Sequence, residues 1–409
     1  MSQATARVLY LSYDGLTDPL GQSQVLPYIL GLCRRGYAFT IVSFEKPERF
    51  AADEDTIRKL IADYPVTWKP LPYTKNPPVL STLLDVRKLS KTCRQIIREQ
   101  PHHIVHCRSY ITALVGLQLQ KQGLKLLFDM RGFWADERVD GGVWNLSNPL
   151  YRTIYNYFKK KEVLYNEKAD HIISLTHAGK DEILSKRLFR YPAKDIRPEK
   201  ISVIPCAADL DHFDPKNISD EQVQAFRRKL QLKDGEKTMM YLGSVGTWYM
   251  LPEMLHFYKR WQAQHPDYHM VYITRDQPAE IREMAESMGI AQERLHVLPA
   301  GREEVPVWLK MADIGLFFIK PVFSKKASSA TKMGEMLAME LPVITNPGVG
   351  DTDLLIAKYE CGMLTEPKAD GPVEDFAFPD HKALRHAAED YFSLTKGIDT
   401  YEQVYKKVL

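Results

Sequence analysis

Residues 328–335, SSATKMGE, place a lysine and a glutamate one turn apart in a segment that favours a helix. Met, Leu and Ala dominate residues 331–340, and the apolar run that follows at 341–344 is typical of a buried strand. Lys332 and Glu335 are three positions apart, so they share one helix face. A capping box does not account for Glu335, because that motif needs Ser or Thr three residues earlier and Lys332 stands there.

The residues before this helix suit the binding of an anion. A helix start offers N–H groups and the positive end of the helix dipole, and small side chains let a phosphate approach the backbone. A sugar attached to such a phosphate would lie about one turn further on, within reach of Glu335. The alternative is a surface ion pair between Lys332 and Glu335, worth about 0.2–0.5 kcal/mol. The small residues are Ser328, Ser329, Ala330 and Thr331.

The elements that position these residues alternate along the whole chain. Short apolar runs separated by helix-like stretches predict βαβ units and mostly parallel sheets. The pattern stops at a polar, turn-rich stretch, 205–215, and then begins again. We therefore expect an α/β fold with two doubly wound Rossmann-like domains facing a cleft. The expected strands lie at 8–14, 39–44, 103–109, 125–130, 171–176 and 201–206, and then at 238–244, 269–275, 294–300, 314–320 and 341–346.

The pattern also sets domain boundaries. We expect an N-terminal, acceptor-binding domain at 1–208, a C-terminal, nucleotide-sugar-binding domain at 209–385, and a final segment, 386–409, that packs back on the first domain as a helix with a break near Gly397. Ligands of open parallel sheets bind beyond the carboxyl ends of the strands. The expected site is therefore formed by the loops that follow Tyr13, Asp129, Ser244, Thr274, Ala300, Lys320 and Asn346.

Charge and cysteine content narrow the class of protein. The chain has 409 residues and five scattered cysteines without C-x-x-C spacing, which favours a reducing compartment. Up to residue 215 there are 31 Lys and Arg against 24 Asp and Glu, and after it 24 against 28. The excess gathers at 86–99, 158–168 and 184–200, which are either solvated helix faces or surfaces for an anionic membrane or a phosphorylated acceptor. No nucleic-acid module accompanies it.

The N-terminus enters a strand-like run without a charged leader and apolar core, and no apolar run of membrane-spanning length occurs. We therefore expect a cytoplasmic protein that lies peripherally at the inner face of the membrane. Within the second basic segment, Lys159, Lys160 and Lys161 follow Tyr and Phe in an amphipathic stretch, which predicts that these three lysines face an anionic membrane.

Several motifs resemble the bacterial family 4 retaining glycosyltransferases of the GT-B fold: TKMGEMLAMELPVITNPGVGD, ISVIPCAADLDHF, ADIGLFFIKP, EKADHIISLT and the opening LSYDGLTDPLGQSQVLPYILGL. The resemblance implies transfer of a hexose-type unit from a nucleotide diphosphate sugar, in the synthesis of cell-surface polysaccharide or glycolipid. It implies that Glu335 binds the donor ribose and that Gly348 and Gly350 border the diphosphate. The loop that closes on the donor would contain Asp14, Gly15, Gly21 and Gln22.

The chain departs from the family pattern at three positions. The family's partner glutamate, eight positions before the ribose glutamate, is replaced by Ala327. The usual Arg and Lys on the diphosphate are replaced by Ser244 and Tyr249. Other cations must therefore offset the phosphate charge. Lys332 is the first candidate because it lies at the helix start, followed by Arg275, Lys320 and Lys326; the strand-end residues Gly243, Ser244, Pro299 and Ala300 complete the expected donor site.

On the acceptor side, Asp129 stands where relatives often have a histidine, and Arg131 follows it by two. The pair predicts either catalytic groups that orient a hydroxyl and bind a phosphate, or a buried structural ion pair. Asp14, Arg108, Asp136 and Glu137 are the expected acceptor-binding residues. His106, at the end of the preceding strand, is more typical of a buried structural histidine.

Metal binding finds little support in the sequence. The nearest Asp-x-Asp, at 209–211, falls in the expected interdomain turn, so we expect neither a metal nor another cofactor. The expected partners are a nucleotide-sugar donor, a glycan or lipid-linked acceptor and an anionic membrane surface, with no nucleic acid. The rival interpretations are a GT-B nucleotide-sugar epimerase and a non-catalytic two-lobed sugar-nucleotide binder.

Overall fold

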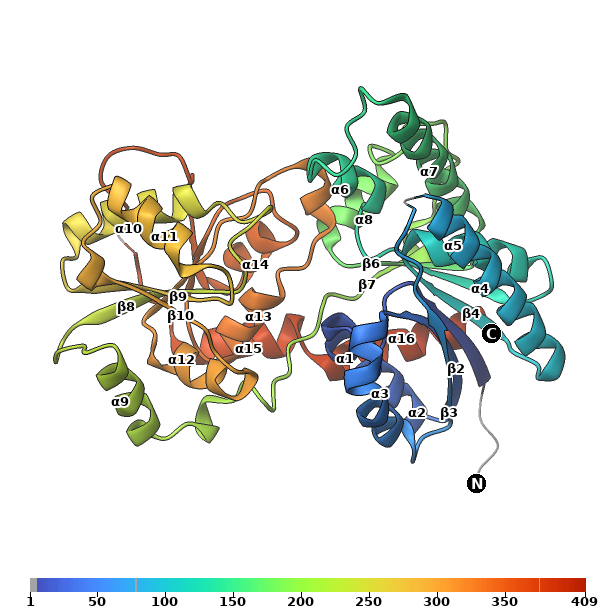
Figure 1. Ribbon diagram of the computed structural model, residues 1–409, viewed down its shortest axis with the longest axis horizontal. Helices are drawn as coiled ribbons and strands as arrows, with labels where there is room; N and C mark the ends of the chain where they lie inside the picture. Colours follow the sequence, from blue (N-terminus) through green and yellow to red (C-terminus); the bar gives the residue numbers. More distant parts are fainter. Residues whose placement is uncertain (1–5, 78, 375) are drawn as a thin grey trace. The chain divides into compact units, whose positions relative to one another are not determined.

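The computed structural model describes residues 6–77, 79–374 and 376–409 (Figure 1). The chain forms two compact units. One contains residues 1–205 together with 394–409, and the other contains 206–393. The boundaries predicted from the sequence are 208 and 385, so the second unit contains about eight more residues at its C-terminal end than predicted. Within the described residues, no helix is both long and apolar enough to cross a bilayer.

The first unit is built on a parallel, seven-stranded sheet in the order β3-β2-β1-β4-β5-β6-β7. Its strands are β1 (Ala6–Ser12), β2 (Tyr37–Glu45), β3 (Val66–Pro72), β4 (Ile104–Arg108), β5 (Lys125–Asp129), β6 (His171–Ser174) and β7 (Ile201–Val203). Its helices are α1 (Pro19–Gln24), α2 (Leu26–Arg34), α3 (Pro47–Ile61), α4 (Leu80–Glu99), α5 (Ser109–Gln120), α6 (Trp134–Asp140), α7 (Pro149–Lys168), α8 (His177–Leu184) and α16 (Leu394–Val408).

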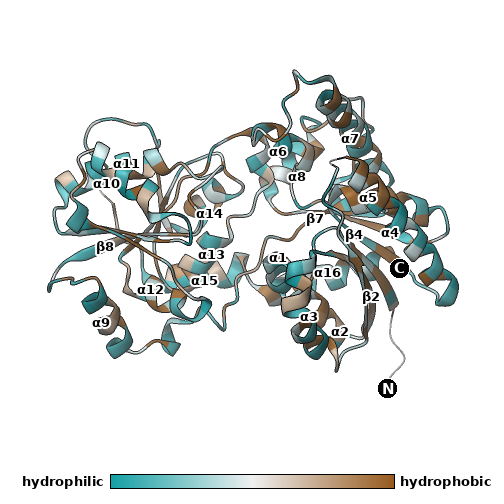
Figure 2. Ribbon diagram, viewed as in Figure 1, coloured by the Kyte–Doolittle hydropathy of each residue, from teal (hydrophilic) through white to brown (hydrophobic). Residues whose placement is uncertain are grey.

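The register of this sheet aligns the ends of three strands, two of which carry the candidate residues Arg108 and Asp129. Ser12 of β1 pairs with Arg108 of β4, and Arg108 pairs with Asp129 of β5. All three strands are parallel, so their carboxyl ends meet at one edge of the sheet. The strands are largely apolar and the outer faces of the surrounding helices are largely polar, as the colours of β2, β4, α3 and α4 show (Figure 2).

The second unit contains a parallel, six-stranded sheet in the order β10-β9-β8-β11-β12-β13. Its strands are β8 (Lys237–Leu242), β9 (Tyr268–Ile273), β10 (Leu295–Leu298), β11 (Ile314–Leu316), β12 (Val343–Thr345) and β13 (Gly362–Leu364). Its helices are α9 (Asp220–Lys229), α10 (Leu251–Gln264), α11 (Pro278–Ser287), α12 (Val305–Met311), α13 (Thr331–Ala338), α14 (Thr352–Tyr359) and α15 (His381–Tyr391), and a short 3-10 helix, η5 (Phe323–Ala327), precedes α13.

The end of the chain differs from the expected helix with a break near Gly397. The helical region is interrupted at Phe392 and Ser393, where it passes from the second unit to the first. Gly397 instead lies inside α16, where a Cβ atom would fall 2.6 Å from the Tyr28 ring. Gly31 of α2 is under the same constraint from Ile398. The glycines therefore permit close packing of α16 on α2 and do not mark a helix end.

Candidate functional site

The site in the second unit is centred on the first turn of α13. The helix begins at Thr331, and the residue at its N-cap is Ala330, whose methyl side chain can accept no hydrogen bond. The start of α13 therefore lacks the side-chain acceptor that usually satisfies one of its N–H groups. Ser329, one residue earlier, accepts a hydrogen bond from the Cys206 N–H (3.1 Å). This arrangement suits an external acceptor such as a phosphate oxygen.

Lys332 extends from this turn to the end of β8. Its Nζ donates a hydrogen bond to the Tyr241 hydroxyl (3.0 Å), and the Tyr241 hydroxyl donates to the Ser244 carbonyl. The same Nζ lies 4.2 Å from the centre of the Tyr241 ring and 3.6 Å from that of Tyr249. Gly243 has a φ of 115°, and a Cβ atom there would lie 3.2 Å from Nζ. The lysine is therefore held against the loop that lacks the family's own cations.

The surroundings of this pair change its proton affinity. Burial lowers the pKa of Lys332 to about 7, although the Glu335 carboxylate acts in the opposite direction. Burial also raises the pKa of Glu335 to about 7, against the effects of Lys332 and Arg302. Each charge is thus costly in the unliganded protein. A bound diphosphate would favour the lysine cation, and ribose hydroxyls would favour the carboxylate.

The other expected cations lie at or near the same sheet edge. Arg275 follows β9 and is exposed, and Lys320 follows β11 and is also exposed. Lys326 lies in η5, with its Nζ 5.8 Å from the centre of the Phe323 ring. Of these candidates, Lys332 is the one whose Nζ reaches the loop after β8. The geometry therefore supports Lys332 as the first candidate for offsetting the diphosphate charge.

One basic residue of this region was absent from the sequence prediction. Lys325 is buried in η5, its Nζ 3.7 Å from the centre of the Trp248 ring. Its carbonyl accepts a hydrogen bond from the Gly350 N–H (2.8 Å). The sequence signal for this lysine is the doublet KK at 325–326. Lysines from η5 and α13 thus each pack on an aromatic ring of the 243–249 loop.

The remaining donor-site residues surround this centre. Gly348 and Gly350 both have positive φ, and the Gly348 N–H donates to the Asp353 carboxylate (2.9 Å). Pro299 and Ala300 follow β10, the former exposed and the latter partly buried, and Ala327 is buried in η5. Since the N–H groups of both glycines are already bonded within the protein, their contribution to a phosphate site would be space for its approach.

In the first unit, Glu45 forms hydrogen bonds with the loop that is expected to close on the donor. This carboxylate is 3% exposed and accepts hydrogen bonds from the N–H groups of Leu16 (2.8 Å) and Thr17 (3.2 Å). A Cβ atom on Gly15 would lie 2.5 Å from the same carboxylate. Gly21 is equally constrained, since its Cβ atom would lie 2.2 Å from the Gly15 carbonyl. Glu45, which sequence reasoning missed, therefore fixes the loop.

Two further residues expected from the sequence, Asp14 and Gln22, lie in this region of the first unit. Gln22 is exposed, and its amide donates to the Thr17 carbonyl (3.3 Å). The Asp14 side chain is 53% exposed and lies 3.8 Å from the guanidinium of Arg108. Arg108 itself is 4% exposed. The structure thus brings the strand-end Arg108 next to Asp14, as expected for neighbouring parallel strands.

Asp129 lies in a buried network that involves the end of the chain. Its carboxylate is 1% exposed, contacts His106 Nε2 (3.3 Å), and accepts a hydrogen bond from the Tyr401 hydroxyl (3.0 Å). His106 Nδ1 contacts the Tyr405 hydroxyl (2.7 Å). The guanidinium of Arg131 lies 3.9 Å from Asp129. This geometry favours the buried structural pair of the two alternatives for Asp129, and confirms His106 as a buried structural histidine.

The network determines the charge of its members. Burial acts to raise the pKa of Asp129, but Arg131 and His106 outweigh it, so the pKa lies below its ordinary value. Burial lowers the pKa of His106. Neutral His106 therefore accompanies an ionised Asp129. Tyr401 and Tyr405 were not predicted, because the sequence indicates that the final helix packs on the first domain but not which of its side chains reach the ends of β4 and β5.

Two further expectations for this unit need correction. Asp136 is 9% exposed, and its oxygens accept hydrogen bonds from the Tyr155 hydroxyl (2.7 Å) and Lys159 Nζ (2.8 Å). Asp136 therefore takes part in a structural ion pair, and little of its carboxylate is exposed to bind an acceptor. Lys159 is 1% exposed and bonded also to the Leu188 carbonyl (2.9 Å), so it cannot face a membrane. Glu137 lies beside Asp136 in α6 and is partly exposed.

Comparison with protein families places this geometry in context. Residues 24–212 match the family model described as Glycosyltransferase Family 4. This segment belongs to Glycosyltransferase Family 4. The match covers most of the first unit and includes β4 and β5 with His106, Asp129 and Arg131, but not Tyr401 or Tyr405 of α16. Comparison with curated proteins gives no match.

Solved structures extend the comparison to the whole chain. A glycosyltransferase from Rickettsia africae has 16% sequence identity and a TM-score of 0.68, with 100% of this chain and 99% of that chain covered. Anabaena HepE, solved with UDP and glucose, has 13% identity and a TM-score of 0.66, with 98% and 99% covered. The chain therefore has the GT-B fold of these glycosyltransferases, as its motifs predicted. How the two units face each other stays a prediction.

A third solved structure shows that the fold alone does not determine the reaction. A putative UDP-N-acetylglucosamine 2-epimerase from Listeria monocytogenes has 14% identity and a TM-score of 0.51, with 98% of this chain and 91% of that chain covered. The distinction between transfer and epimerisation therefore depends on the side chains of the site.

Proposed function

We propose that this protein is a retaining glycosyltransferase that moves a hexose-type unit from a nucleotide diphosphate sugar to a hydroxyl of a glycan or lipid-linked acceptor, in the synthesis of cell-surface polysaccharide or glycolipid. The observation that carries the proposal is the position of Lys332. Its ammonium lies at the start of α13 and against Gly243, so a diphosphate at this helix start would meet a cation and the positive end of the helix dipole together.

Stabilisation of the leaving group is the main catalytic contribution in this proposal. Negative charge grows on the diphosphate as the glycosidic bond breaks, and a cation already fixed beside it lowers the barrier without reorganisation. Lys332 is fixed by the Tyr241 hydroxyl and the Tyr249 ring. Loss of one such donor typically raises a barrier by about 3–4 kcal/mol.

Glu335 contributes to donor binding. It is three positions beyond Lys332 on the same face of α13, where the ribose of a nucleotide at the helix start would lie. An ionised carboxylate can accept hydrogen bonds from two ribose hydroxyls. The complex of HepE with UDP and glucose supports a nucleoside diphosphate as the ligand, since a protein of this fold binds one.

On the acceptor side we propose a division of labour between Asp129 and Arg131. Asp129 is buried and holds His106 and Arg131 in place, so it acts as a positioning residue. Arg131, whose side chain lies beside Asp129 and is 8% exposed, is the residue of the pair that we assign to a phosphate or an acceptor hydroxyl. We propose no protein nucleophile: the leaving phosphate takes the proton of the attacking hydroxyl on the same face of the sugar, which retains the anomeric configuration.

The test combines product analysis with one variant. The protein is screened against nucleotide sugars by thermal shift, and each stabilising donor is then incubated with glycan and lipid-linked acceptors. Release of nucleoside diphosphate that requires the acceptor, with a product whose anomeric configuration by NMR matches the donor, supports the proposal. Interconversion of the donor sugar without an acceptor would instead identify an epimerase, and binding without either reaction a non-catalytic binder.

A further inference from the structure

The outer face of α4 carries exposed leucines near its N-terminal end. Leu80 is 56% exposed, Leu83 54% and Leu84 43%. Single exposed leucines are common on protein surfaces, but three within five residues of one helix form a patch. The opposite face of α4 is fully packed, since Leu89, Cys93 and Ile96 are buried. The leucines are therefore not needed for the packing of α4 on its own unit.

A row of cations continues the same face toward the C-terminal end of α4. Arg87, Lys91, Arg94 and Arg98 are all exposed. Successive helical residues are rotated by about 100°. With spacings of three and four, the leucines and these cations fall on one stripe, which we call the α4 stripe and which runs for about 27 Å along the helix.

Three of the four cations keep their charge available for a partner. Arg94 donates hydrogen bonds to the Ser90 hydroxyl (2.8 Å) and to the Gln118 amide oxygen (3.1 Å). Among the residues that the structure describes, no hydrogen bond or ion pair satisfies the side chains of Arg87, Lys91 or Arg98. The stripe thus differs from the Lys159 region, where the cation is buried and paired.

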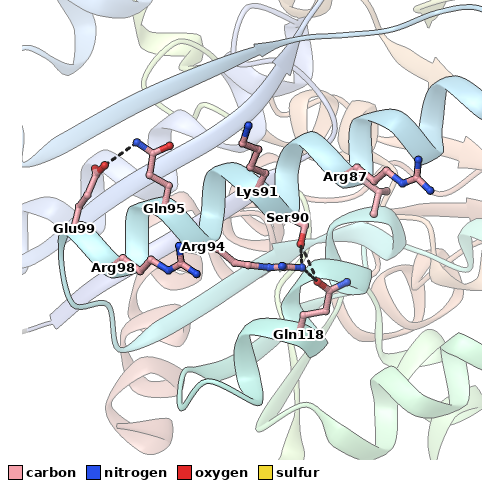
Figure 3. A pocket seen from close by; sticks show the side chains of 9 residues that line it. Arg87, Ser90, Lys91, Arg94, Gln95, Arg98, Glu99 and Gln118 are labelled. Atoms are coloured by element: carbon pink, nitrogen blue, oxygen red, sulfur yellow. Dashed lines mark hydrogen bonds between the residues drawn. The ribbon is translucent and has the colours of Figure 1, made fainter.

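The stripe borders a groove of about 660 Å³ between α4 and α5. Figure 3 shows Arg94 extending toward Gln118, while Lys91 points away from Gln118. The groove is lined by the four cations of the stripe together with Val86, Ser90, Gln95, Gln118 and one carboxylate, Glu99, which accepts a hydrogen bond from the Gln95 amide (2.8 Å). An anionic head group in this groove would meet hydrogen-bond donors on several sides.

We propose that the α4 stripe is a docking surface for an anionic lipid bilayer. The cations match a negatively charged head-group layer, and the leucines reach the boundary between head groups and acyl chains, as in helices that lie in a membrane interface. Nucleic acid or an acidic protein would use the cations but would leave the exposed leucines without an apolar partner. The combination on one face therefore favours a bilayer. This proposal does not depend on the proposed transfer reaction.

The test is co-sedimentation of the full-length protein with vesicles at low salt. One set contains phosphatidylcholine alone, and the other contains phosphatidylcholine with an anionic phospholipid. We expect binding to the anionic set only, weakened by added salt. In the double variant Arg87→Gln/Lys91→Gln, the partition coefficient should fall by about 30-fold, which corresponds to the loss of two surface cations.

A matched control removes two exposed cations from another helix. Arg49→Gln/Lys59→Gln on α3 changes the net charge by the same amount and should retain most of the binding. An equal loss in both double variants would mean that net charge alone attracts the protein, and would overturn the proposal. Circular dichroism and thermal unfolding verify that each variant is folded.

A second pair of variants distinguishes a bilayer from another polyanion. Leu83→Gln/Leu84→Gln should weaken vesicle binding by about tenfold or more, as expected when two apolar side chains no longer enter the interface, and should leave binding to heparin unchanged. If this variant binds anionic vesicles as the wild type does, the stripe is a general anion site, and the bilayer proposal is wrong.

Discussion

The ammonium of Lys332 lies 3.6 Å from the centre of the Tyr249 ring. Tyr249 stands at the loop position where family 4 relatives commonly have a lysine, so a cation from α13 lies beside that position. A cation over an aromatic face is stabilised even where water is scarce. The loss of one basic residue from the loop is therefore accompanied by a basic residue that reaches the loop from another element.

The first prediction is that Lys332→Met lowers turnover by about a hundredfold or more, because the developing charge on the leaving group loses its nearest cation. The methionine keeps most of the aliphatic volume, and the buried charge is costly in the unliganded protein, so the melting temperature should stay the same or rise. Steady-state kinetics and differential scanning fluorimetry measure both. Arg275→Gln, which removes an exposed cation of the same sheet edge, is the control; a larger loss in this control would move the role to Arg275.

The second prediction concerns Glu335→Gln and donor affinity. A charged acceptor of ribose hydroxyls contributes about 1.5–3 kcal/mol per hydrogen bond, so the dissociation constant of the nucleoside diphosphate should rise by about tenfold or more. Isothermal titration calorimetry measures it. Unchanged affinity would show that the ribose lies elsewhere.

The same variant predicts a dependence of stability on pH. The folded pKa of Glu335 is about 7, above its ordinary value of 4.5. The protonated acid is thus favoured by folding, and its contribution is complete below pH 4.5 and is lost as the pH rises through 7. Glu335→Gln should therefore raise the melting temperature more at pH 8 than at pH 5. Equal shifts at the two pH values would contradict the raised pKa.

The fold was largely accessible from the sequence. Each of the eleven strands expected from apolar runs has a counterpart in the structure, because buried parallel strands are continuous apolar segments. Two edge strands were missed. β3 contains Pro70 and Pro72, and proline in a sheet is confined to edges and strand ends, whereas β13 has only three residues and half-buried side chains. Neither has the apolar pattern on which the prediction relied.

The candidate site was accessible only in part. The helix start at Lys332 and Glu335 was found because both residues lie in one short segment. The Asp129 network was not, because Tyr401 lies 272 positions away from its acceptor. The expected roles of Asp136 and Lys159 were also wrong, because both side chains are buried. Lys159 Nζ donates a hydrogen bond to the Asp136 carboxylate inside the first unit. Pair formation of this kind depends on tertiary packing, which spacing along the chain does not encode.

A further prediction is that donor binding weakens as the pH rises above 7. The free protein has a Lys332 pKa of about 7, so above that pH the lysine must take up a proton to bind a diphosphate as a cation. The linkage predicts a fall in affinity of up to about tenfold per pH unit between pH 7.5 and 9. Lys332→Met should show a nearly flat profile over this range. A wild-type slope retained in the variant would assign the titration to another group.

Removal of divalent metal provides a separate prediction. Among the described residues, no group of three or more His, Cys, Asp or Glu side chains is arranged to hold a metal ion. If Lys332 and the α13 start offset the diphosphate charge, turnover should be unchanged after dialysis against EDTA. Restoration of a lost activity by Mg²⁺ or Mn²⁺, but not by Ca²⁺ or by higher ionic strength, would show that a metal shares that task.

The last prediction tests whether α16 stabilises the acceptor-side network. The Tyr401 hydroxyl donates to the buried Asp129 carboxylate, which would lose a charge-assisted hydrogen bond in Tyr401→Phe. The cost should be about 1.5–3 kcal/mol, a fall of roughly 3–12 °C in the melting temperature of the first unit. Tyr157→Phe, on an exposed tyrosine of α7, is the matched control and should change little. Because the proposed donor site lies in the second unit, we expect the same nucleoside diphosphate affinity in both variants. Weaker nucleotide binding in Tyr401→Phe alone would show that the network acts on the donor site, and the assignment of Asp129 as a positioning residue of the acceptor side would have to be revised.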